Sequence, residues 1–224
     1  MKNKMMKLIK TTLLLLLCTA FIMPKANGYA LTERQKAINA YSKYLSYSKT
    51  YVLKYGTSYV HYIGSGRFGE AKYNGTKASS TDFAIMYINN DDIPELIVRG
   101  DVGGMKSYGV YTYKNGKVQF VYGEEEAIFR GCYTKTGYFV SLEDLEASPY
   151  VDYMRDYVLM SGTRATKVYT HKVVKGKNVK FWIKGQPVSE AKYTRAIRGA
   201  VQNKKMTAVK YYKNTRANRK RVLR

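Results

Sequence analysis

Residues 88–98, INNDDIPELIV, place oxygen-bearing side chains at the spacing that a hard cation requires. Calcium loops alternate side-chain oxygens, then use a backbone carbonyl, and close with a carboxylate. In such a loop Asn89 and Asp91 would supply the side-chain oxygens. Ile93 would supply its carbonyl and Glu95 the closing carboxylate. The segment therefore predicts a Ca²⁺ site, with a polar turn leading into a strand as the alternative.

This segment resembles the D-x-D-x-D-G-x-P-E-L loops of secreted clostridial proteins, which are similar to the calcium loops of FG-GAP-type repeats. A helix followed by FAIMYINNDDIPELIV, VYTYKNGKVQ, WIKGQPVSEAKY and YYKNTRANRKRVL resembles a family of small exported proteins from anaerobic Firmicutes (Clostridia). That family has no established activity, so the resemblance implies export and fold rather than function. Tyr87 stands in place of the first Asp and Asp92 in place of the Gly, and the lost carboxylate should weaken Ca²⁺ binding.

Two acidic runs in the middle of the chain could supply the carboxylates of a glycoside hydrolase. They are Glu124, Glu125 and Glu126, and then Glu143, Asp144 and Glu146. A glycosidase needs two carboxylates held about 5 to 10 Å apart across a cleft. Runs of charge are more often solvated turns, so the sequence favours that interpretation over catalysis.

Two further motifs carry little chemistry. GSGRFG at residues 64–69 has the glycine spacing of a dinucleotide loop, but no apolar helix follows it, so it predicts an ordinary loop. The chain has 2 Cys, and only Cys132 remains if the first thirty residues are removed. We interpret Cys132 as a small buried residue rather than a nucleophile.

Positive charge is concentrated in the last third of the chain. The 224 residues carry a formal net charge of +23, and residues 157–224 contain Glu190 as their single acid. A hydrophobic fraction of 45% excludes a disordered polybasic chain. Such charge asymmetry predicts a polyanionic partner. The candidate binding residues are Lys204, Lys205, Lys210, Lys213, Arg216, Arg219, Lys220, Arg221 and Arg224.

The first thirty residues have the pattern of a secretory signal peptide. MKNKMMKLIK is basic, TTLLLLLCTAFIM is apolar, and small residues follow it. Cleavage is expected after Gly28 or Ala30, which predicts a secreted or cell-wall-associated protein. A retained membrane anchor and a lipoprotein modified at Cys18 are the less favoured alternatives, because the apolar run is short and bulky Leu residues precede the Cys.

The remaining residues, 31–224, predict one α+β domain. Residues 31–49 and 188–201 have helical spacing, and Thr32 and Ser189 are expected to cap those helices. Between the helices lie short β-type runs, of which 108–113 and 118–123 flank the hairpin dipeptide Asn115-Gly116. We therefore expect an N-terminal helix, one antiparallel β-meander sheet of about seven to nine strands, a C-terminal helix and a short basic terminal segment.

These patterns favour an exported, non-enzymatic binding or structural protein. The partner would be an anionic cell-wall polymer or an acidic glycan, since export argues against nucleic acid. Ca²⁺ is the only cofactor that the sequence suggests, and the membrane would be involved only through the signal peptide. The alternative function is a secreted glycan hydrolase that uses carboxylates of the acidic middle segment. Simple solubilisation by like charges is the alternative for the basic third.

Overall fold

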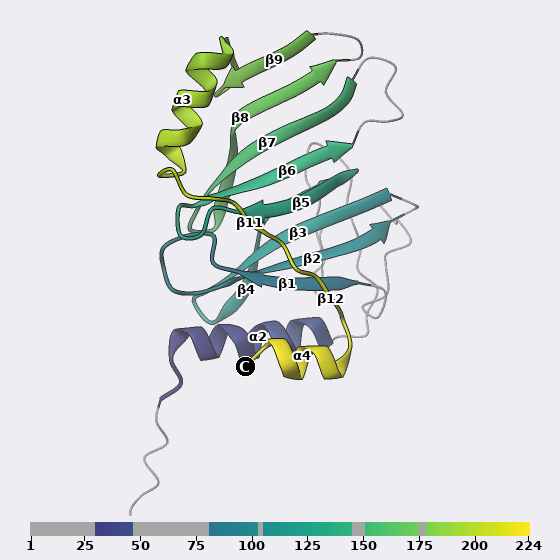
Figure 1. Cartoon of the computed structure of the whole chain (residues 1–224). Coiled ribbons are helices and arrows are strands. Elements are labelled where there is room, and N and C mark those ends of the chain that lie inside the picture. Colours follow the sequence, from purple (N-terminus) through teal and green to yellow (C-terminus); the bar gives the residue numbers. More distant parts are fainter. Residues whose placement is uncertain (1–29, 47–80, 103–104, 145–150, 175–177) are drawn as a thin grey trace, which may run out of the picture. The chain divides into compact units, whose positions relative to one another are not determined.

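The computed structural model describes residues 30–46, 81–102, 105–144, 151–174 and 178–224 (Figure 1). The chain divides into two compact units, Met1–Leu31 and Thr32–Arg224, and the second contains every helix and strand described below. The predicted signal peptide and the loop at 64–69 lie outside the described residues. In the part of the chain that the structure describes, no helix combines the length and apolar character needed to span a bilayer.

The first meander forms a five-stranded sheet with the order β12-β1-β2-β3-β4. Its strands are β1 (Asp82–Met86), β2 (Glu95–Val102), β3 (Met105–Lys114), β4 (Lys117–Glu125) and β12 (Tyr212–Lys213). The predicted turn between β3 and β4 is confirmed, because Asn115 and Gly116 have φ values of 53° and 77°. Positive φ at both positions matches the right-handed twist of the flanking strands.

The second meander forms a seven-stranded antiparallel sheet with the order β10-β9-β8-β7-β6-β5-β11. Its strands are β5 (Ala127–Cys132), β6 (Tyr138–Asp144), β7 (Val151–Ser161), β8 (Arg164–Val174), β9 (Asn178–Ile183), β10 (Gln186–Val188) and β11 (Thr207–Ala208). The prediction of a single sheet is therefore wrong. The chain leaves the first sheet at Glu126, where φ is 53°, and β5 pairs with β6 and β11 instead of β4.

Three helices complete the described fold, and each begins at a polar cap. α2 (Glu33–Ser46) starts with a reciprocal capping box, in which the Gln35 N–H donates to Thr32 Oγ1 and the Thr32 N–H donates to Gln35 Oε1. α3 (Glu190–Ala200) and α4 (Arg216–Val222) are capped by Ser189 and Thr215. The caps expected at Thr32 and Ser189 are thus confirmed.

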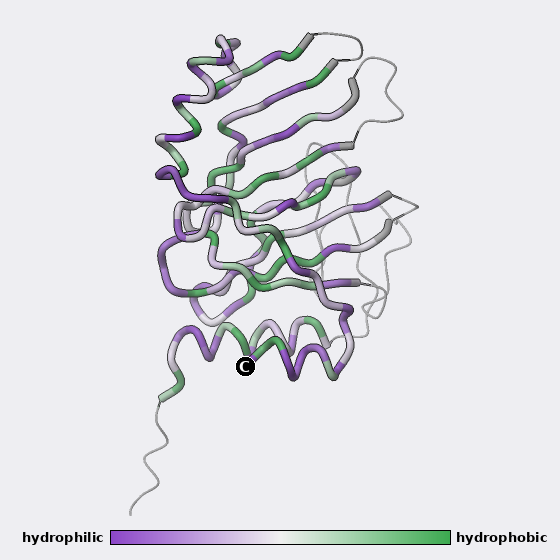
Figure 2. Tube along the Cα trace, in the orientation of Figure 1, coloured by the Kyte–Doolittle hydropathy of each residue, from purple (hydrophilic) through white to green (hydrophobic). Residues whose placement is uncertain are grey.

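The helices and the two sheets form layers, and an apolar core lies between each pair of neighbouring layers. Tyr41 and Leu45 of α2 pack with Phe83 and Leu96 on one face of the five-stranded sheet. A second core, which includes Ile97 and residues of β5, β6 and β7, lies between the two sheets. The third packs α3 against the other face of the seven-stranded sheet. Apolar and polar residues accordingly alternate along the strands and helices (Figure 2).

One segment joins both sheets after α3, and we call residues 207–213 the strap. The strap contains two short strands, β11 on β5 and β12 on β1 (Figure 1). Gly131 of β5 lies directly beneath it, with φ of 150°, and a Cβ there would collide with the Thr207 carbonyl oxygen. Val209 and Tyr211 of the strap pack against the core between the sheets.

Candidate functional site

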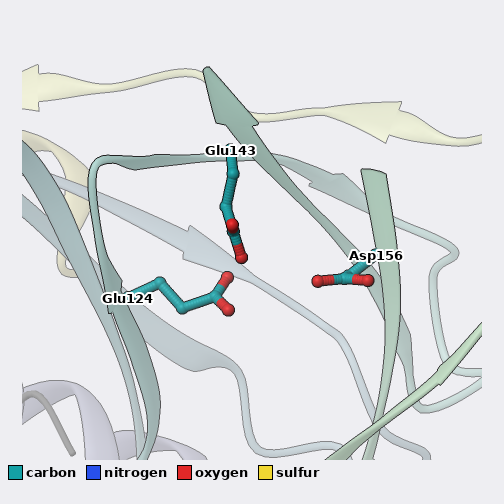
Figure 3. A group of neighbouring side chains, drawn as sticks. All are labelled: Glu124, Glu143 and Asp156. Atoms are coloured by element: carbon teal, nitrogen blue, oxygen red, sulfur yellow. The ribbon is translucent and has the colours of Figure 1, made fainter. Parts of the chain in front are cut away.

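Three carboxylates from different strands converge at one end of the core between the sheets. Glu124 of β4, Glu143 of β6 and Asp156 of β7 point toward one another (Figure 3). One oxygen from each lies within 4.8 Å of the others. Lys167 of β8 forms ion pairs with all three, with its Nζ 2.8 Å from Asp156 Oδ2 and 2.9 Å from Glu143 Oε1. We call these four residues the carboxylate–lysine cluster.

Neighbouring strands hold the oxygens of this cluster in place. Ser141 and Thr170 lie opposite Asp156 on β6 and β8. The Thr170 hydroxyl donates to Asp156 Oδ1 at 2.5 Å, and the Ser141 hydroxyl donates to Glu124. The Tyr108 hydroxyl lies 3.5 Å from the same Glu124 oxygen. The cluster is therefore fixed by both sheets, because β3 and β4 belong to one and β6, β7 and β8 to the other.

Burial sets the electrostatics of the cluster. The Asp156 side chain is 1% exposed, whereas that of Lys167 is 37% exposed. Burial raises the pKa of Glu143 above its usual range, although the Lys167 ammonium opposes that change. Burial alone would lower the pKa of Lys167, but the charges of Glu124 and Asp156 outweigh it and keep that pKa raised. The ammonium thus stays charged and neutralises part of the carboxylate charge.

The arrangement is that of an internal ion-pair network rather than an open catalytic pair. A hydrolase leaves the space between its carboxylates free for the scissile bond. Here the Lys167 ammonium contacts all three carboxylates and occupies the point at which they converge. It also fills the position that a bound cation would take, so a metal would have to displace Lys167.

The acidic runs of the sequence contribute one residue each to this cluster. Glu124 and Glu143 are brought together, whereas Glu126 is exposed at the turn between the sheets. The side chains of Glu125, Asp144 and Glu146 lie outside what the structure describes. Sequence reasoning missed Asp156 and Lys167. The signal for Asp156 was its alternation with Val158 and Met160, because an acid on the buried face of a strand requires a partner.

The predicted calcium loop has the form of a tight polar turn. Asn89 Oδ1 accepts from the Asp91 N–H, and Asp91 Oδ1 accepts from the Ile93 N–H, both at 3.0 Å. Asp92 adopts φ of 59° in place of the expected glycine, and its carboxylate pairs with Lys135. Tyr87, at the position of the first Asp, accepts a hydrogen bond from Arg34 of α2. The calcium site stays a prediction, with the side-chain oxygens of Asn89 and Asp91 engaged inside the loop.

Glu95, the expected closing ligand, is fully buried at the start of β2. Its Oε2 accepts from the Ile88 N–H at 2.8 Å, and its Oε1 has no hydrogen-bond partner among the described residues. Burial raises the pKa of Glu95 to about 8, against the opposing effect of the Ile88 N–H. The buried side chain therefore stabilises the turn through its hydrogen bond with Ile88, and it is largely protonated at neutral pH.

Cys132 is buried at the end of β5, as the sequence predicts. Its thiol points to the Tyr87 carbonyl oxygen at 3.7 Å. Burial raises the pKa of Cys132 to about 12, and the nearby Glu95 carboxylate adds to that increase. A thiol with this pKa is almost entirely protonated at neutral pH and is a poor nucleophile.

The basic C-terminal segment follows one path from α3 along the strap to α4 (Figure 1). We call its exposed cations the basic band. They are Lys192, Arg195, Arg198, Lys204, Lys205, Lys210, Lys213, Arg216, Lys220, Arg221 and Arg224. Within the described part of the chain, none of them forms an ion pair. Their charge is therefore available to an external partner.

Arg219 differs from the other predicted polyanion-binding residues. It is half-buried, and its Nη1 donates to Asn214 Oδ1 at 2.7 Å and reaches the Leu45 carbonyl oxygen at 3.5 Å. Asn214 itself is buried and donates to the same Leu45 carbonyl and to Thr81 Oγ1. Arg219 thus fastens α4 to the end of α2, and we do not count it in the basic band.

The resemblance to small exported clostridial proteins, which spans most of residues 31–224, stays a prediction. No family model, no curated protein and no solved structure matches the chain.

Proposed function

We propose that the protein is an exported, non-enzymatic binding protein that docks on an anionic cell-wall polymer through the basic band. The single observation that carries this proposal is the distribution of ion pairs. The acids Glu33, Asp82, Asp92 and those of the carboxylate–lysine cluster have cationic partners, whereas the exposed cations of the band have none within the described residues. An unpaired, exposed row of cations attracts polyanions at long range.

The band is also partly ordered by its own aromatic contacts. Arg221 and Lys210 both lie over the Tyr212 ring, at 5.4 Å and 5.7 Å from its centroid. Two like charges are thus held near one another without a carboxylate between them. An anionic group that bridges the two would relieve their repulsion, which supports polymer binding over plain solubilisation.

The chemistry of the cluster supports a binding role over the hydrolase alternative. The carboxylates that the sequence offers for catalysis, Glu124 and Glu143, are both bound to Lys167. Neither one is left to act as a general acid opposite a second free carboxylate. The cluster accordingly acts as a fastening between the two sheets.

Retention on insoluble bacterial wall, with and without its teichoic acids, tests the proposal. We expect retention only on wall that carries the anionic polymer, and a steep decrease as salt rises, because the contacts are electrostatic. The variant Arg216→Glu/Lys220→Glu/Arg221→Glu should bind about 100-fold more weakly, on the basis of about 1 kcal/mol per basic residue near an anionic surface.

The matched control applies the same change of charge away from the band. Lys114, Lys117 and Lys180 are exposed on the two sheets, and Lys114→Glu/Lys117→Glu/Lys180→Glu should retain most of the binding. Equal losses in both variants would show that only net charge matters. Retention that ignores salt or teichoic acid would refute the proposal outright.

A further inference from the structure

A pocket of about 310 Å³ lies where the strap crosses the edges of both sheets. This volume is at the lower end of the range for small-molecule sites and matches a single sugar-sized unit. The lining comes from β1, β2, β3, β5 and the strap. The residues that matter below are Asp82, Arg99, Lys106, Tyr108, Phe129 and Tyr211.

The pocket has an aromatic floor and a charged mouth. Tyr108 and Phe129, which are 1% and 0% exposed, form the deep part, with their rings edge-to-face at 5.6 Å between centroids. Lys106 is exposed, and the Arg99 side chain is 47% exposed, so both cations lie nearer to solvent. A ligand with a polar end and a less polar body fits this gradient.

Arg99 is held in one orientation by two contacts. Its Nε and Nη2 donate to Asp82 Oδ2 at 3.0 Å and 2.8 Å. The guanidinium carbon lies 4.0 Å from the centroid of the Tyr211 ring. One edge of the guanidinium is therefore committed to Asp82, while Nη1 has no partner among the described residues. A fixed guanidinium edge is well suited to an anionic oxygen group.

The charge of the lining restricts the ligand. Among the lining side chains that the structure describes, Arg99 and Lys106 are the cations and Asp82 is the acid, which leaves one positive charge in excess. No described carboxylate pairs with Lys106. A singly charged group such as a carboxylate or a phosphodiester balances this excess. A phosphate monoester carries about 1.5 to 2 negative charges at neutral pH and matches it less well.

The strap, which carries part of the basic band, also forms one side of the pocket wall. Tyr211 lies between Lys210 and Lys213, both of which are exposed. A polyanion that follows the band therefore passes Tyr211. This continuity gives the pocket a source of anionic units.

We propose that the pocket binds one singly charged unit of the polymer, a carboxylate or phosphodiester on a sugar- or polyol-sized body. Arg99 Nη1 and Lys106 contact the anionic oxygens, and the body lies against Tyr108 and Phe129. This inference rests on the proposed function for the source of the unit. The binding of a small monoanion itself is independent of it.

Titration of residues 31–224, the chain expected after signal-peptide cleavage, with four small probes tests the inference. The probes are glucuronate, glycerophosphoglycerol, glucose and glycerol 3-phosphate. Calorimetry measures their affinity, and changes in amide chemical shifts locate the residues that they contact. We expect glucuronate or glycerophosphoglycerol to bind and to shift resonances of β2, β3 and the strap. Whichever of the two binds more tightly identifies a uronic acid or a phosphodiester as the unit. Glucose should not bind, and glycerol 3-phosphate should bind more weakly than the better monoanion.

Four variants separate the pocket from general charge effects. Lys106→Met should weaken binding about two- to fivefold, as for one exposed ion pair, whereas Lys114→Met on the same strand should have no effect. Arg99→Met/Lys106→Met leaves Asp82 as the only charged side chain of the described lining and should abolish binding. Asp82→Asn raises the excess to two positive charges and should reverse the preference in favour of glycerol 3-phosphate.

The outcomes distinguish this inference from the proposed function. Arg216→Glu/Lys220→Glu/Arg221→Glu should lose retention on wall but still bind the small probe. If no probe binds the wild type while wall retention persists, the pocket inference is wrong and the basic band stands. If a probe binds but Lys106→Met and Lys114→Met behave alike, the pocket is not its site.

Discussion

At the scale of single residues, the Lys167 side chain joins the carboxylates that the two sheets bring together. Its ammonium is the cationic partner of Glu124, Glu143 and Asp156. Removing one partner of a buried ion pair leaves uncompensated charge and is more harmful than replacing the whole pair. The side chain of Asp156 is the most buried of the three carboxylates, so the loss of its ion pair should cost the most stability.

We predict that Lys167→Met lowers the free energy of unfolding at pH 7 by about 2 to 4 kcal/mol, less than for a fully buried pair because Lys167 is partly exposed. Urea denaturation measures the loss. The loss should shrink near pH 4, where the carboxylates take up protons. Lys172→Met, on the same strand and without a described ion pair, is the control and should change little. Similar curves for the two variants would show that the cluster contributes nothing to stability.

Glu95 gives a second residue-scale prediction, on the pH dependence of stability. Burial raises the pKa of Glu95 to about 8, whereas the ordinary value is 4.5. The folded state thus holds a proton that the unfolded chain releases between these values. The stabilising contribution is complete below pH 4.5 and is lost as the pH rises through 8, with a slope of at most about 1.4 kcal/mol per pH unit.

Glu95→Gln keeps an acceptor for the Ile88 N–H but cannot titrate, so it should remove this part of the slope. Denaturation of both proteins at pH 5, 6.5 and 8 provides the comparison, and parallel curves would contradict the prediction. Calcium offers a second arm. If the loop binds Ca²⁺ through Glu95, millimolar Ca²⁺ should stabilise the wild type at pH 8. Asp91→Ala and Glu95→Gln should then both abolish that gain.

At the scale of elements, the sequence predicts most helices and strands but not how the strands divide into sheets. Alternation of apolar residues, the Asn115-Gly116 turn and the caps Thr32 and Ser189 are local signals, and the structure confirms them. The separation at Glu126 depends on which strand β5 pairs with, and that choice is decided by packing far along the chain. Local pattern contains no such information.

The candidate site divides in the same way. The acidic runs identify Glu124 and Glu143, but their meeting with Asp156 and Lys167 requires the register of β6, β7 and β8 and the packing of β4 from the other sheet. The pocket at the strap is still harder to foresee, because it combines β2 and β3 with a segment more than a hundred residues away. The exposed cations of the basic band need no such register, so the sequence identifies them from charge alone, and their binding role stays a prediction.

Asn214 provides the element-scale prediction, because it fastens the C-terminal helix to the rest of the fold. It donates to the Leu45 carbonyl at the end of α2 and accepts from Arg219 of α4. Asn214→Ala would leave buried polar groups without partners, and we expect a loss of about 1 to 3 kcal/mol in the free energy of unfolding. Asn218→Ala, with more exposed contacts, should lose less than about 0.5 kcal/mol. Equal losses for the two variants would show that the buried hydrogen bonds of Asn214 contribute no more to stability than the exposed ones of Asn218.

At the scale of the whole molecule, the fold and the proposed binding surface are largely separate. The three apolar cores contain none of the cations of the basic band. The ion pairs of the described residues lie in the sheets, in α2 and in the loops between strands. The basic band therefore adds positive charge that contributes no ion pair to the described part of the fold. Self-repulsion of that charge should lower stability, and a bound polyanion should restore it.

We predict from this separation that salt stabilises the free protein. Raising NaCl from 20 to 300 mM shortens the screening length from about 20 Å to below 8 Å, so repulsion along the band should weaken and the melting temperature should rise. Arg216→Glu/Lys220→Glu/Arg221→Glu should show a smaller rise, because it has already relieved the repulsion. A soluble teichoic acid fragment should raise the wild-type melting temperature at 20 mM NaCl and lose that effect at 300 mM. A melting temperature that falls with salt would instead mean that the ion pairs of the sheets outweigh the band, and charge in the band would then carry no energetic cost for a polymer to relieve.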